Sequence, residues 1–268
     1  MNNTFGFIGT GNMGGALVKA AAKGMNPENI LLANRTAKKA EELAEQLGCG
    51  AATVEAVAEK SGYIFLGVKP QMMQGLMDTI APVLAKRTDE FVLVSMAAGL
   101  TMADIAAMTG GDYPVIRIMP NTPVAVGSGL ILYDASASVK PEVLEQFCEN
   151  MRFAGRLDRL SENLIDAGSA VAGCGPAFTC MFLEALADGG VACGLPRDKA
   201  LAYGAQMLLG TAALVLESGK HPGELKDAVC SPGGATIAGV RALEQGAFRA
   251  AAMDAVQAAY KRTKELGK

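Results

Sequence analysis

The stretch Phe5-Gly6-Phe7-Ile8-Gly9-Thr10-Gly11-Asn12-Met13-Gly14 decides the fold of the first half of this chain. Its first four residues are mostly apolar and predict a short buried strand. The glycine-rich segment after them predicts a tight turn, and residues 13–22 have the apolar spacing of a helix. A Gly-x-Gly-x-x-Gly motif between a strand and a helix is typical of a dinucleotide-binding domain.

Each glycine of this motif has a mechanical task in such a domain. Gly9 makes the tight turn, Gly11 lets a pyrophosphate approach the backbone, and Gly14 lets the helix lie close to the strand. The free N–H groups at the start of the helix then favour a bound anion. The predicted cofactor-binding residues of this loop are Ile8, Gly9, Thr10, Gly11, Asn12, Met13 and Gly14.

Apolar runs and helical segments alternate over roughly the first 155 residues. The runs that predict strands are 5–8, 30–33, 63–68, 91–95 and 115–119, with amphipathic segments such as 37–47 between them. We expect an α/β fold with a doubly wound parallel sheet, the Rossmann arrangement, and helices on both faces of it. Residues 129–133 are predicted to form the last strand, and residues 141–151 a helix.

The pattern changes after about residue 158, because no further strand is predicted there. The predicted helices are 162–172, 176–193, 198–217, 235–245 and 247–266. The helix over 176–193 is apolar almost all round, so it must be buried in a bundle or against another subunit. We therefore expect a Rossmann domain over 1–158 and an all-α domain over 159–268. The second domain is predicted to form a homodimer, and a bundle within one chain is the alternative.

Composition excludes several classes of partner. The formal net charge is −3, whereas nucleic acids and acidic membranes attract a basic surface. No basic cluster precedes the first apolar run, and the apolar stretch 91–108 is interrupted by polar residues, so we expect neither a signal peptide nor a membrane span. A cytoplasmic protein is predicted. The six cysteines form no Cys-x-x-Cys pair and there is one histidine, so no metal site is expected.

The segment Asn34-Arg35-Thr36, after the second predicted strand, indicates which dinucleotide is bound. In NAD-binding domains an acidic residue near this place binds the ribose 2′-hydroxyl. Asn34 does not repel a 2′-phosphate, Arg35 can bind it through two hydrogen bonds, and Thr36 can cap the next helix. Lys38 and Lys39 add positive charge nearby. We predict NADP(H) as the cofactor, with NADH as a weaker substitute.

Two more segments follow predicted strands, and ligands of doubly wound sheets bind outside the carboxyl ends of strands. The first adds the predicted cofactor residues Val68, Lys69, Pro70 and Gln71. Lys69 is either a functional cation or a strand-end lysine paired with a carboxylate. In the second segment, Met119 and Asn121 are candidate substrate residues, although the two prolines beside Asn121 also suit a purely structural turn.

The segment Ser231-Pro232-Gly233-Gly234-Ala235-Thr236-Ile237 begins a predicted helix. Two successive glycines let backbone N–H groups converge on an anion, and the helix dipole favours a carboxylate or phosphate there. The alternative is an ordinary helix C-cap and turn, which such glycines commonly make. With a nicotinamide domain in the same chain, we favour a substrate carboxylate. The predicted substrate residues are Ser231, Gly233, Gly234, Ala235 and Thr236.

Six motifs, in order along nearly the whole chain, carry a family resemblance. They are FIGTGNMG (7–14), VKPQ (68–71), SMAAGLT (95–101), IRIMPNTP (116–123), DGGVACGLPRDKA (188–200) and HPGELKDAVCSPGGATIAGVRALE (221–244). Together they resemble the pyrroline-5-carboxylate reductases, and SPGGATI is the most specific of them.

This resemblance implies hydride transfer from NAD(P)H to the C=N bond of 1-pyrroline-5-carboxylate, which gives L-proline. It also implies a helical dimerisation domain, a larger ring of dimers, and an active site between the cofactor and a neighbouring subunit's helices. Residue by residue, it implies that Ala97 lies on the nicotinamide side and that Glu162 contacts the substrate. The hydroxyl of Thr236 would meet the ring nitrogen as the catalytic group.

Two other functions are weighed against this one. A β-hydroxyacid dehydrogenase has a similar N-terminal domain but usually employs a lysine on the first helix of its second domain, and residues 162–186 contain no lysine. A catalytically silent NADP(H)-binding module would have no use for the SPGGATI segment. A protonated cyclic imine needs no strong protein acid, so we interpret His221 as a surface residue at the start of a helix.

Overall fold

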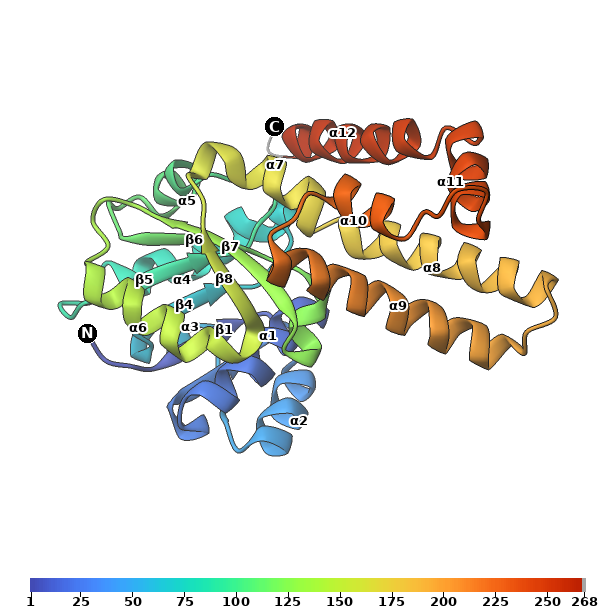
Figure 1. Ribbon diagram of the computed structural model, residues 1–268. Helices are drawn as coiled ribbons and strands as arrows, with labels where there is room; N and C mark the ends of the chain where they lie inside the picture. Colours follow the sequence, from blue (N-terminus) through green and yellow to red (C-terminus); the bar gives the residue numbers. More distant parts are fainter. Residues whose placement is uncertain (267–268) are drawn as a thin grey trace. The chain divides into compact units, whose positions relative to one another are not determined.

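The computed structural model describes residues 1–266, and these form two compact units. The first unit contains Met1–Cys174 together with the described residues from Ala259 onward, and the second contains Gly175–Ala258. Figure 1 shows that the first unit is built on a sheet and the second on helices.

The first unit contains an eight-stranded sheet in the order β3-β2-β1-β4-β5-β6-β7-β8 (Figure 1). The strands are β1 Phe5–Ile8, β2 Ile30–Ala33, β3 Gly50–Ala51, β4 Tyr63–Leu66, β5 Val92–Ser95, β6 Val115–Pro120, β7 Gly129–Ala135 and β8 Gly155–Arg159. All neighbours pair in parallel except β6 and β7, which are antiparallel. The first six strands follow the order of a doubly wound dinucleotide-binding sheet, which confirms the predicted fold class.

Helices cover both faces of this sheet, as the continuous apolar strands predict. They are α1 Asn12–Gly24, α2 Ala37–Leu47, α3 Val54–Lys60, α4 Met73–Leu84, α5 Met102–Thr109, α6 Pro141–Met151 and α7 Glu162–Ala172. The bounds of α6 and α2 are those expected from the sequence. Short 3-10 turns join several elements, namely η1 Pro27–Asn29, η2 Pro70–Met72, η3 Thr122–Val126 and η4 Arg152–Ala154.

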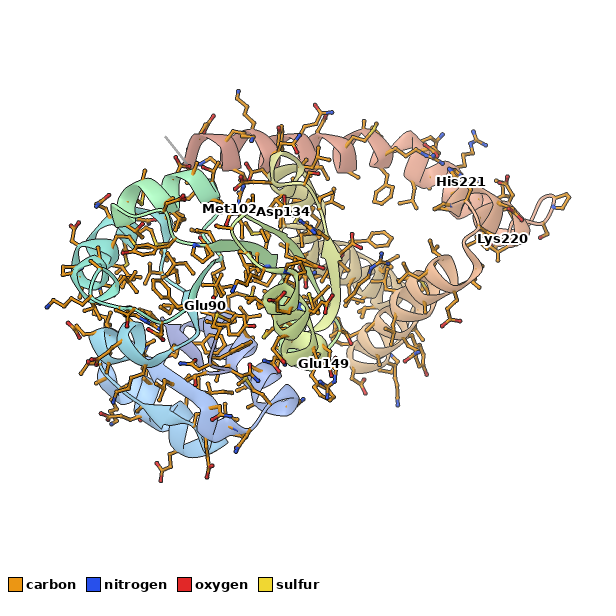
Figure 2. All side chains as sticks on the ribbon, turned by 90° about the vertical axis from the view of Figure 1, so that its left-hand side faces the viewer. Glu90, Met102, Asp134, Glu149, Lys220 and His221 are labelled. Carbon is orange, nitrogen blue, oxygen red and sulfur yellow. The ribbon has the colours of Figure 1, made fainter. Side chains whose placement is uncertain are left out.

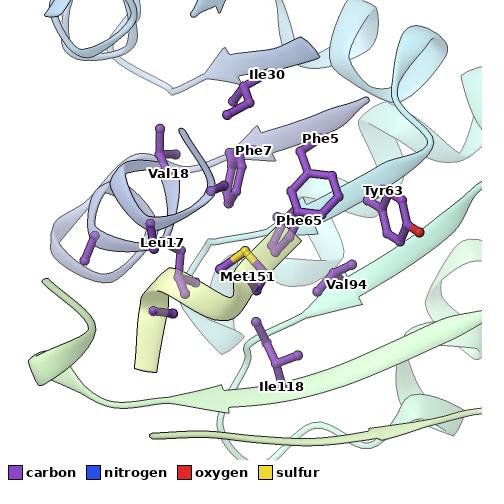
Figure 3. Packing of buried hydrophobic residues seen from close by; sticks show 14 of the residues in the cluster. Phe5, Phe7, Leu17, Val18, Ile30, Tyr63, Phe65, Val94, Ile118 and Met151 are labelled. Atoms are coloured by element: carbon purple, nitrogen blue, oxygen red, sulfur yellow. The ribbon is translucent and has the colours of Figure 1, made fainter. Parts of the chain in front are cut away.

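Alternate side chains of each strand enter one of two cores, because a strand points successive residues to opposite faces. Phe7 packs under α1 in one core, whereas Ile8 packs towards α3 and α4 in the other. The first core holds a cluster of aromatic rings (Figure 3), in which Phe7 stacks on Phe65 with ring centroids 4.1 Å apart. Burying each such ring stabilises the fold by about 1.5–3 kcal/mol. This core holds the strand that ends at the glycine-rich loop.

The sheet extends beyond its predicted last strand. β8 pairs with β7 in parallel, and a side chain at Gly155 would lie 2.2 Å from the carbonyl oxygen of Gly129. The sequence of β8, Gly-Arg-Leu-Asp-Arg, is too polar to predict a strand. Since β8 has a neighbour on one side only, it lies at the edge of the sheet, where polar side chains are tolerated.

The predicted domain boundary after residue 158 lies one residue before the end of the sheet at Arg159, and the first compact unit continues to Cys174. Helix α7 belongs to this unit because Ile165 is buried against Met119 and Leu132 of the sheet. Asp134 on β7 accepts a hydrogen bond from the first N–H group of α7 at 2.9 Å and so anchors its start. The boundary of an independently folding domain stays a prediction.

The second unit is entirely helical within the described residues. Its helices are α8 Gly175–Ala192, α9 Arg197–Ser218, α10 Pro222–Ala228, α11 Ala235–Gln245 and the larger part of α12 Phe248–Leu266. Helices α8 and α9 lie so close that a side chain at Gly204 would be 2.7 Å from Leu183. Phe182 on α8 contacts Phe248, the first residue of α12, with ring centroids 5.4 Å apart.

No bounds were predicted for helix α10, because it is only seven residues long and follows the helix-breaking residues 219–222. His221, labelled in Figure 2 beside Lys220, is its N-cap residue. The imidazole Nδ1 accepts a hydrogen bond from the Gly223 N–H group at 3.1 Å, and the side chain is exposed. The interpretation of His221 as a surface residue at a helix start is confirmed.

The helices of the second unit expose many large apolar side chains. Met181, Leu209 and Leu216 are 70%, 64% and 74% exposed. Two stretches, Glu162–Ala192 and Arg197–Ser218, are long and apolar enough to cross a membrane when judged by length and composition alone. An apolar surface of this extent requires another surface to cover it.

Candidate cofactor and substrate site

A cleft of about 1330 Å³ lies at the carboxyl ends of β1, β2 and β4. Eleven of the predicted cofactor residues line it. They are Ile8, Gly9, Thr10, Gly11, Asn12, Asn34, Arg35, Thr36, Val68, Lys69 and Gln71. The order of the strands brings these three loops together, because parallel strands end at the same edge of a sheet.

The three motif glycines are placed as their predicted tasks require. Gly9 has a φ of +104°, and a side chain there would lie 2.4 Å from the carbonyl oxygen of Gly67. A side chain at Gly14 would lie 2.1 Å from the carbonyl oxygen of Gly9, so that α1 could not approach the loop. A side chain at Gly11 would enter open space in the cleft, where a pyrophosphate can approach. The loop therefore fits a dinucleotide.

The start of α1 offers free hydrogen-bond donors to the cleft. Gly11 is its N-cap and has no side chain, so it makes no capping hydrogen bond. The first N–H groups of a helix have no partner within the helix. Those of Asn12, Met13 and Gly14 donate to no acceptor among residues 1–266. They can bind the oxygens of a pyrophosphate.

The loop after β2 presents Arg35 and Thr36 to the cleft as exposed residues. The Asn34 amide donates to the Thr36 carbonyl oxygen at 3.5 Å and shapes this turn. Thr36 is the N-cap of α2, but its hydroxyl makes no capping hydrogen bond, so that part of the prediction was wrong. The first turn of α2 contains no acidic residue. A 2′-phosphate would therefore meet Arg35, the Thr36 hydroxyl and the N–H groups of Ala37 and Lys38, which have no acceptor among residues 1–266.

Lys69 is exposed at the cleft and joins none of the ion pairs among residues 1–266. Lys69 was interpreted either as a functional cation or as a lysine paired with a carboxylate, and the described residues show no such pair.

Pro70 begins the turn η2 and is not among the residues that line the cleft. Ala97 is 1% exposed, and its N–H group donates to the Ser95 hydroxyl at 3.4 Å. The side chain of Met13 packs on the core, and neither Met13 nor Gly14 is among the residues that line the cleft.

Several cleft residues were missed by the sequence analysis, and Lys39 was named there only as a nearby positive charge. Helix α1 contributes Gly15, Ala16 and Lys19 to the lining, and α2 contributes Lys39. On α1 these residues follow Asn12 at the spacing of one helical face, so helix periodicity from the glycine motif could have found them. Ala125 of η3 also lines the cleft, which no local signal in the sequence indicates.

The segment 231–234 forms a tight turn that leads into α11. The Gly234 N–H group donates to the Ser231 carbonyl oxygen at 3.0 Å, and Gly233 has a φ of +69°. Proline followed by such a residue is the pattern of a type II turn. Gly234 is the N-cap of α11 and leaves the N–H groups of Ala235 and Thr236 without an acceptor among residues 1–266. The N–H group of Gly234 itself is used by the turn.

The remaining predicted substrate residues hold the fold together. Met119 is buried in a small core with Ile165. The Asn121 amide donates to the Ala172 carbonyl oxygen at 3.1 Å and accepts from the Leu130 N–H group at 2.8 Å. Their contact with substrate stays a prediction.

Glu162, the first residue of α7, is tied to two other elements. Its Oε1 atom accepts from the Met102 N–H group at 2.6 Å, at the start of α5, and lies 3.6 Å from Nη1 of Arg117. Figure 2 labels Met102 and Asp134, the two residues that anchor this helix start. The Glu162 side chain is 26% exposed, and its role towards substrate stays a prediction.

Comparison with known proteins identifies the family. The family model described as pyrroline-5-carboxylate reductase dimerisation matches residues 162–266, and that described as NADP oxidoreductase, coenzyme F420-dependent, matches residues 4–99. The pyrroline-5-carboxylate reductase of Escherichia coli is 38% identical over 271 residues, which covers the whole of both chains. That of Arabidopsis thaliana is 40% identical and covers 97% of this chain and 94% of its own. The chain belongs to the pyrroline-5-carboxylate reductase family.

Solved structures of pyrroline-5-carboxylate reductases have the same fold. The crystal structure of the Plasmodium falciparum enzyme with NADP bound has a TM-score of 0.89 at 29% identity, and the match covers 100% of this chain and 99% of that one. The Coxiella burnetii structure has a TM-score of 0.89 at 30% identity and covers all of both chains. The present chain is accordingly an NADP-dependent oxidoreductase, as predicted.

The family match also accounts for the apolar surface of the second unit. Residues 162–266 form a pyrroline-5-carboxylate reductase dimerisation domain, so the chain associates with itself through its C-terminal helices. An interface with another copy would bury apolar side chains such as the exposed Met181, Leu209 and Leu216. The predicted oligomerisation through this domain is confirmed, and the size of the assembly stays a prediction.

Proposed function

We propose that this chain catalyses the NADPH-dependent reduction of 1-pyrroline-5-carboxylate to L-proline. The identity of 38–40% with named pyrroline-5-carboxylate reductases over nearly the whole chain carries this proposal. When bound, the reduced nicotinamide supplies the hydride that adds to the C=N carbon. The ring nitrogen takes up or already carries one proton, so that the product is a secondary amine.

The cleft residues would bind and orient the cofactor. The N–H groups at the start of α1 would hold the pyrophosphate, and Arg35 would hold the 2′-phosphate. NADPH is therefore expected to bind more tightly than NADH, which lacks this phosphate. Lys69 and Val68 border the same cleft at the end of β4 and would lie near the nicotinamide half.

The substrate would be held by its carboxylate at the start of α11. The N–H groups of Ala235 and Thr236 point away from the helix and lack acceptors among residues 1–266. They and the helix dipole favour an anion there. The Thr236 hydroxyl would accept a hydrogen bond from the protonated ring nitrogen and orient one face of the imine. Ser231 is exposed in the same turn and adds a second hydroxyl.

We further propose that the complete active site is assembled in a homodimer and that dimers join into a larger ring. The exposed apolar faces of α8 and α9 support the first part of this proposal. The net charge of −3 supports a cytoplasmic location without a nucleic-acid or membrane partner. Cell fractionation of a tagged chain would test the location.

The decisive experiment mixes the purified protein with NADPH and 1-pyrroline-5-carboxylate and follows the absorbance of the reduced cofactor. We expect NADPH consumption with one equivalent of proline formed. A matched reaction contains NADP⁺ and β-hydroxyacids and should show no reduction. Turnover in the second reaction only would support a hydroxyacid dehydrogenase, and tight NADPH binding without turnover in either would support a silent binding module.

A further inference from the structure

Two neighbouring lysines on α2 have different surroundings. Lys39 lines the cofactor cleft together with Thr36, Leu43 and Gln46, which share one face of the helix at three- and four-residue spacing. Lys38 does not line the cleft, and its Nζ atom lies 3.8 Å from Oε1 of Glu42. Both lysines are exposed, so position on the helix rather than burial distinguishes them.

The charges around Lys39 leave it available to a ligand. Neither Lys39 nor Arg35 joins any of the ion pairs among residues 1–266. Glu42 is the one carboxylate residue in the lining of the cleft, and it is the partner of Lys38. The end of the cleft formed by α2 therefore carries two unpaired cations.

A ribose 2′-phosphate carries about −1.5 to −2 charges near pH 7, since its second pKa is near 6. The single positive charge of the Arg35 guanidinium would neutralise one of these negative charges and leave up to one more on the phosphate. Arg35 lies in the turn before α2, and Lys39 follows one helical turn after the N-cap Thr36. An anion at the start of α2 would thus have a cation on each side of it.

We propose that Lys39 is a second cation for the 2′-phosphate and, with Arg35, sets the preference for NADPH over NADH. The inference rests on the proposed function only in taking this cleft as the NADP(H) site. Lys38 carries the same charge one residue away, but it pairs with Glu42 and does not line the cleft. It would therefore act on the phosphate only through the long-range electrostatic field of its charge. That field is weak, because exposed charges are screened by salt.

The test measures cofactor binding without any imine, by the fluorescence of the bound reduced nicotinamide. The chain has no tryptophan, so the nicotinamide signal is free of tryptophan emission. Lys39→Ala should raise the Kd for NADPH about tenfold and change the Kd for NADH less than about twofold. Lys38→Ala removes an equal charge from the same helix and should change both constants less than about twofold.

Salt provides a second readout. Raising the salt concentration should weaken NADPH binding less in Lys39→Ala than in the wild type, because the variant has lost one screened contact. Equal changes for NADPH and NADH, or equal effects of Lys38→Ala and Lys39→Ala, would overturn the proposal. Because no imine is present, these results are independent of which substrate the enzyme reduces.

Discussion

Arg117 on β6 and Asp166 on α7 form a buried ion pair, with Nη2 of the arginine 2.5 Å from Oδ1 of the aspartate. The two side chains are 2% and 7% exposed. Lys264 of α12 lies 2.9 Å from the other carboxylate oxygen, and Glu162 lies 3.6 Å from Nη1 of Arg117. Arg117 and Asp166 are buried where the sheet meets α7, whereas Glu162 and Lys264, the second carboxylate and the second cation, are 26% and 48% exposed at the edge of this pair.

Asp166→Asn is predicted to destabilise the protein strongly. The substitution removes one charge and leaves the Arg117 guanidinium buried without its closest counter-ion, which costs about 3–5 kcal/mol for buried pairs. Urea unfolding followed by circular dichroism measures the loss. Asp158→Asn is the matched control, since Asp158 pairs with Arg156 at 3.0 Å on the surface and should cost less than about 1 kcal/mol. Equal losses would show that burial of the pair is irrelevant.

The same pair predicts a pH dependence. Burial by itself raises the pKa of Asp166, but the hydrogen bond from Lys264 and the charge of Arg117 outweigh it, so that the pKa lies below its usual value. The free energy from ionised Asp166 is therefore present above the unfolded pKa of about 3.9 and is lost as the pH falls through the lower folded pKa.

The measurable quantity is the difference in urea midpoint between the wild type and Asp166→Asn. It should stay constant between about pH 7 and 5 and shrink below about pH 4. Taking the difference cancels the titration of the other carboxylates. A difference that grows on acidification would contradict the assigned direction of the pKa shift.

Arg35→Ala is predicted to weaken NADPH selectively. Loss of hydrogen bonds between a guanidinium and a phosphate costs about 1.5–3 kcal/mol, which is about a tenfold to hundredfold rise in the KM for NADPH. The KM for NADH should hardly change. Arg156→Ala, an exposed arginine on β8 outside the cleft, is the control. An unchanged ratio of the two KM values in Arg35→Ala would refute the assigned 2′-phosphate site.

Thr236→Ala is predicted to lower kcat about tenfold to hundredfold, because one hydrogen bond to a charged group is lost from the imine. The KM for NADPH should be unaffected. Thr236→Ser keeps the hydroxyl and should retain kcat within a few-fold of the wild type. If serine fails to restore what alanine removes, the hydroxyl is not the operative group.

Self-association predicts a molar mass of at least twice the 27.6 kDa of one chain in light scattering. Leu209 and Leu216 are seven residues apart on α9 and strongly exposed. Changing both to lysine should reduce the mass to that of one chain and abolish activity, because charges oppose apolar burial. Val126→Lys, at a residue 77% exposed in the first unit, is the control and should leave the mass unchanged. A double variant of unchanged mass would place the interface elsewhere.

Local signals predicted some elements and missed others for identifiable reasons. Strand β1 and the turn at Gly9 followed from an apolar run and a glycine motif, both of which act over a few residues. Strand β8 was missed because Arg156, Asp158 and Arg159 obscure its apolar pattern, and only pairing with β7 makes it a strand. Thr36 was correctly predicted to be the N-cap of α2. Whether its hydroxyl accepts a capping hydrogen bond from the helix depends on the side-chain rotamer, and here it accepts none.

Residue identity alone could not assign the polar groups near the predicted substrate site. Asn121 and Glu162 have the chemistry of ligand-binding residues, yet their hydrogen bonds go to Leu130, Ala172 and Met102. Leu130 is nine residues from Asn121, but Ala172 is 51 residues from Asn121, and Met102 is 60 residues from Glu162. Only the folded chain brings them together.

From the amino-acid sequence came the dinucleotide fold, the NADP-type loop, the helical second domain and the family, since glycine positions, apolar periodicity and contiguous motifs are all local properties. The tertiary structure decided which residues line the cleft, that Lys39 rather than Lys38 faces it, and that Arg117 is neutralised by Asp166. The physical reason is distance: a charge acts on whatever lies within a few ångströms in space, and folding alone determines that neighbour.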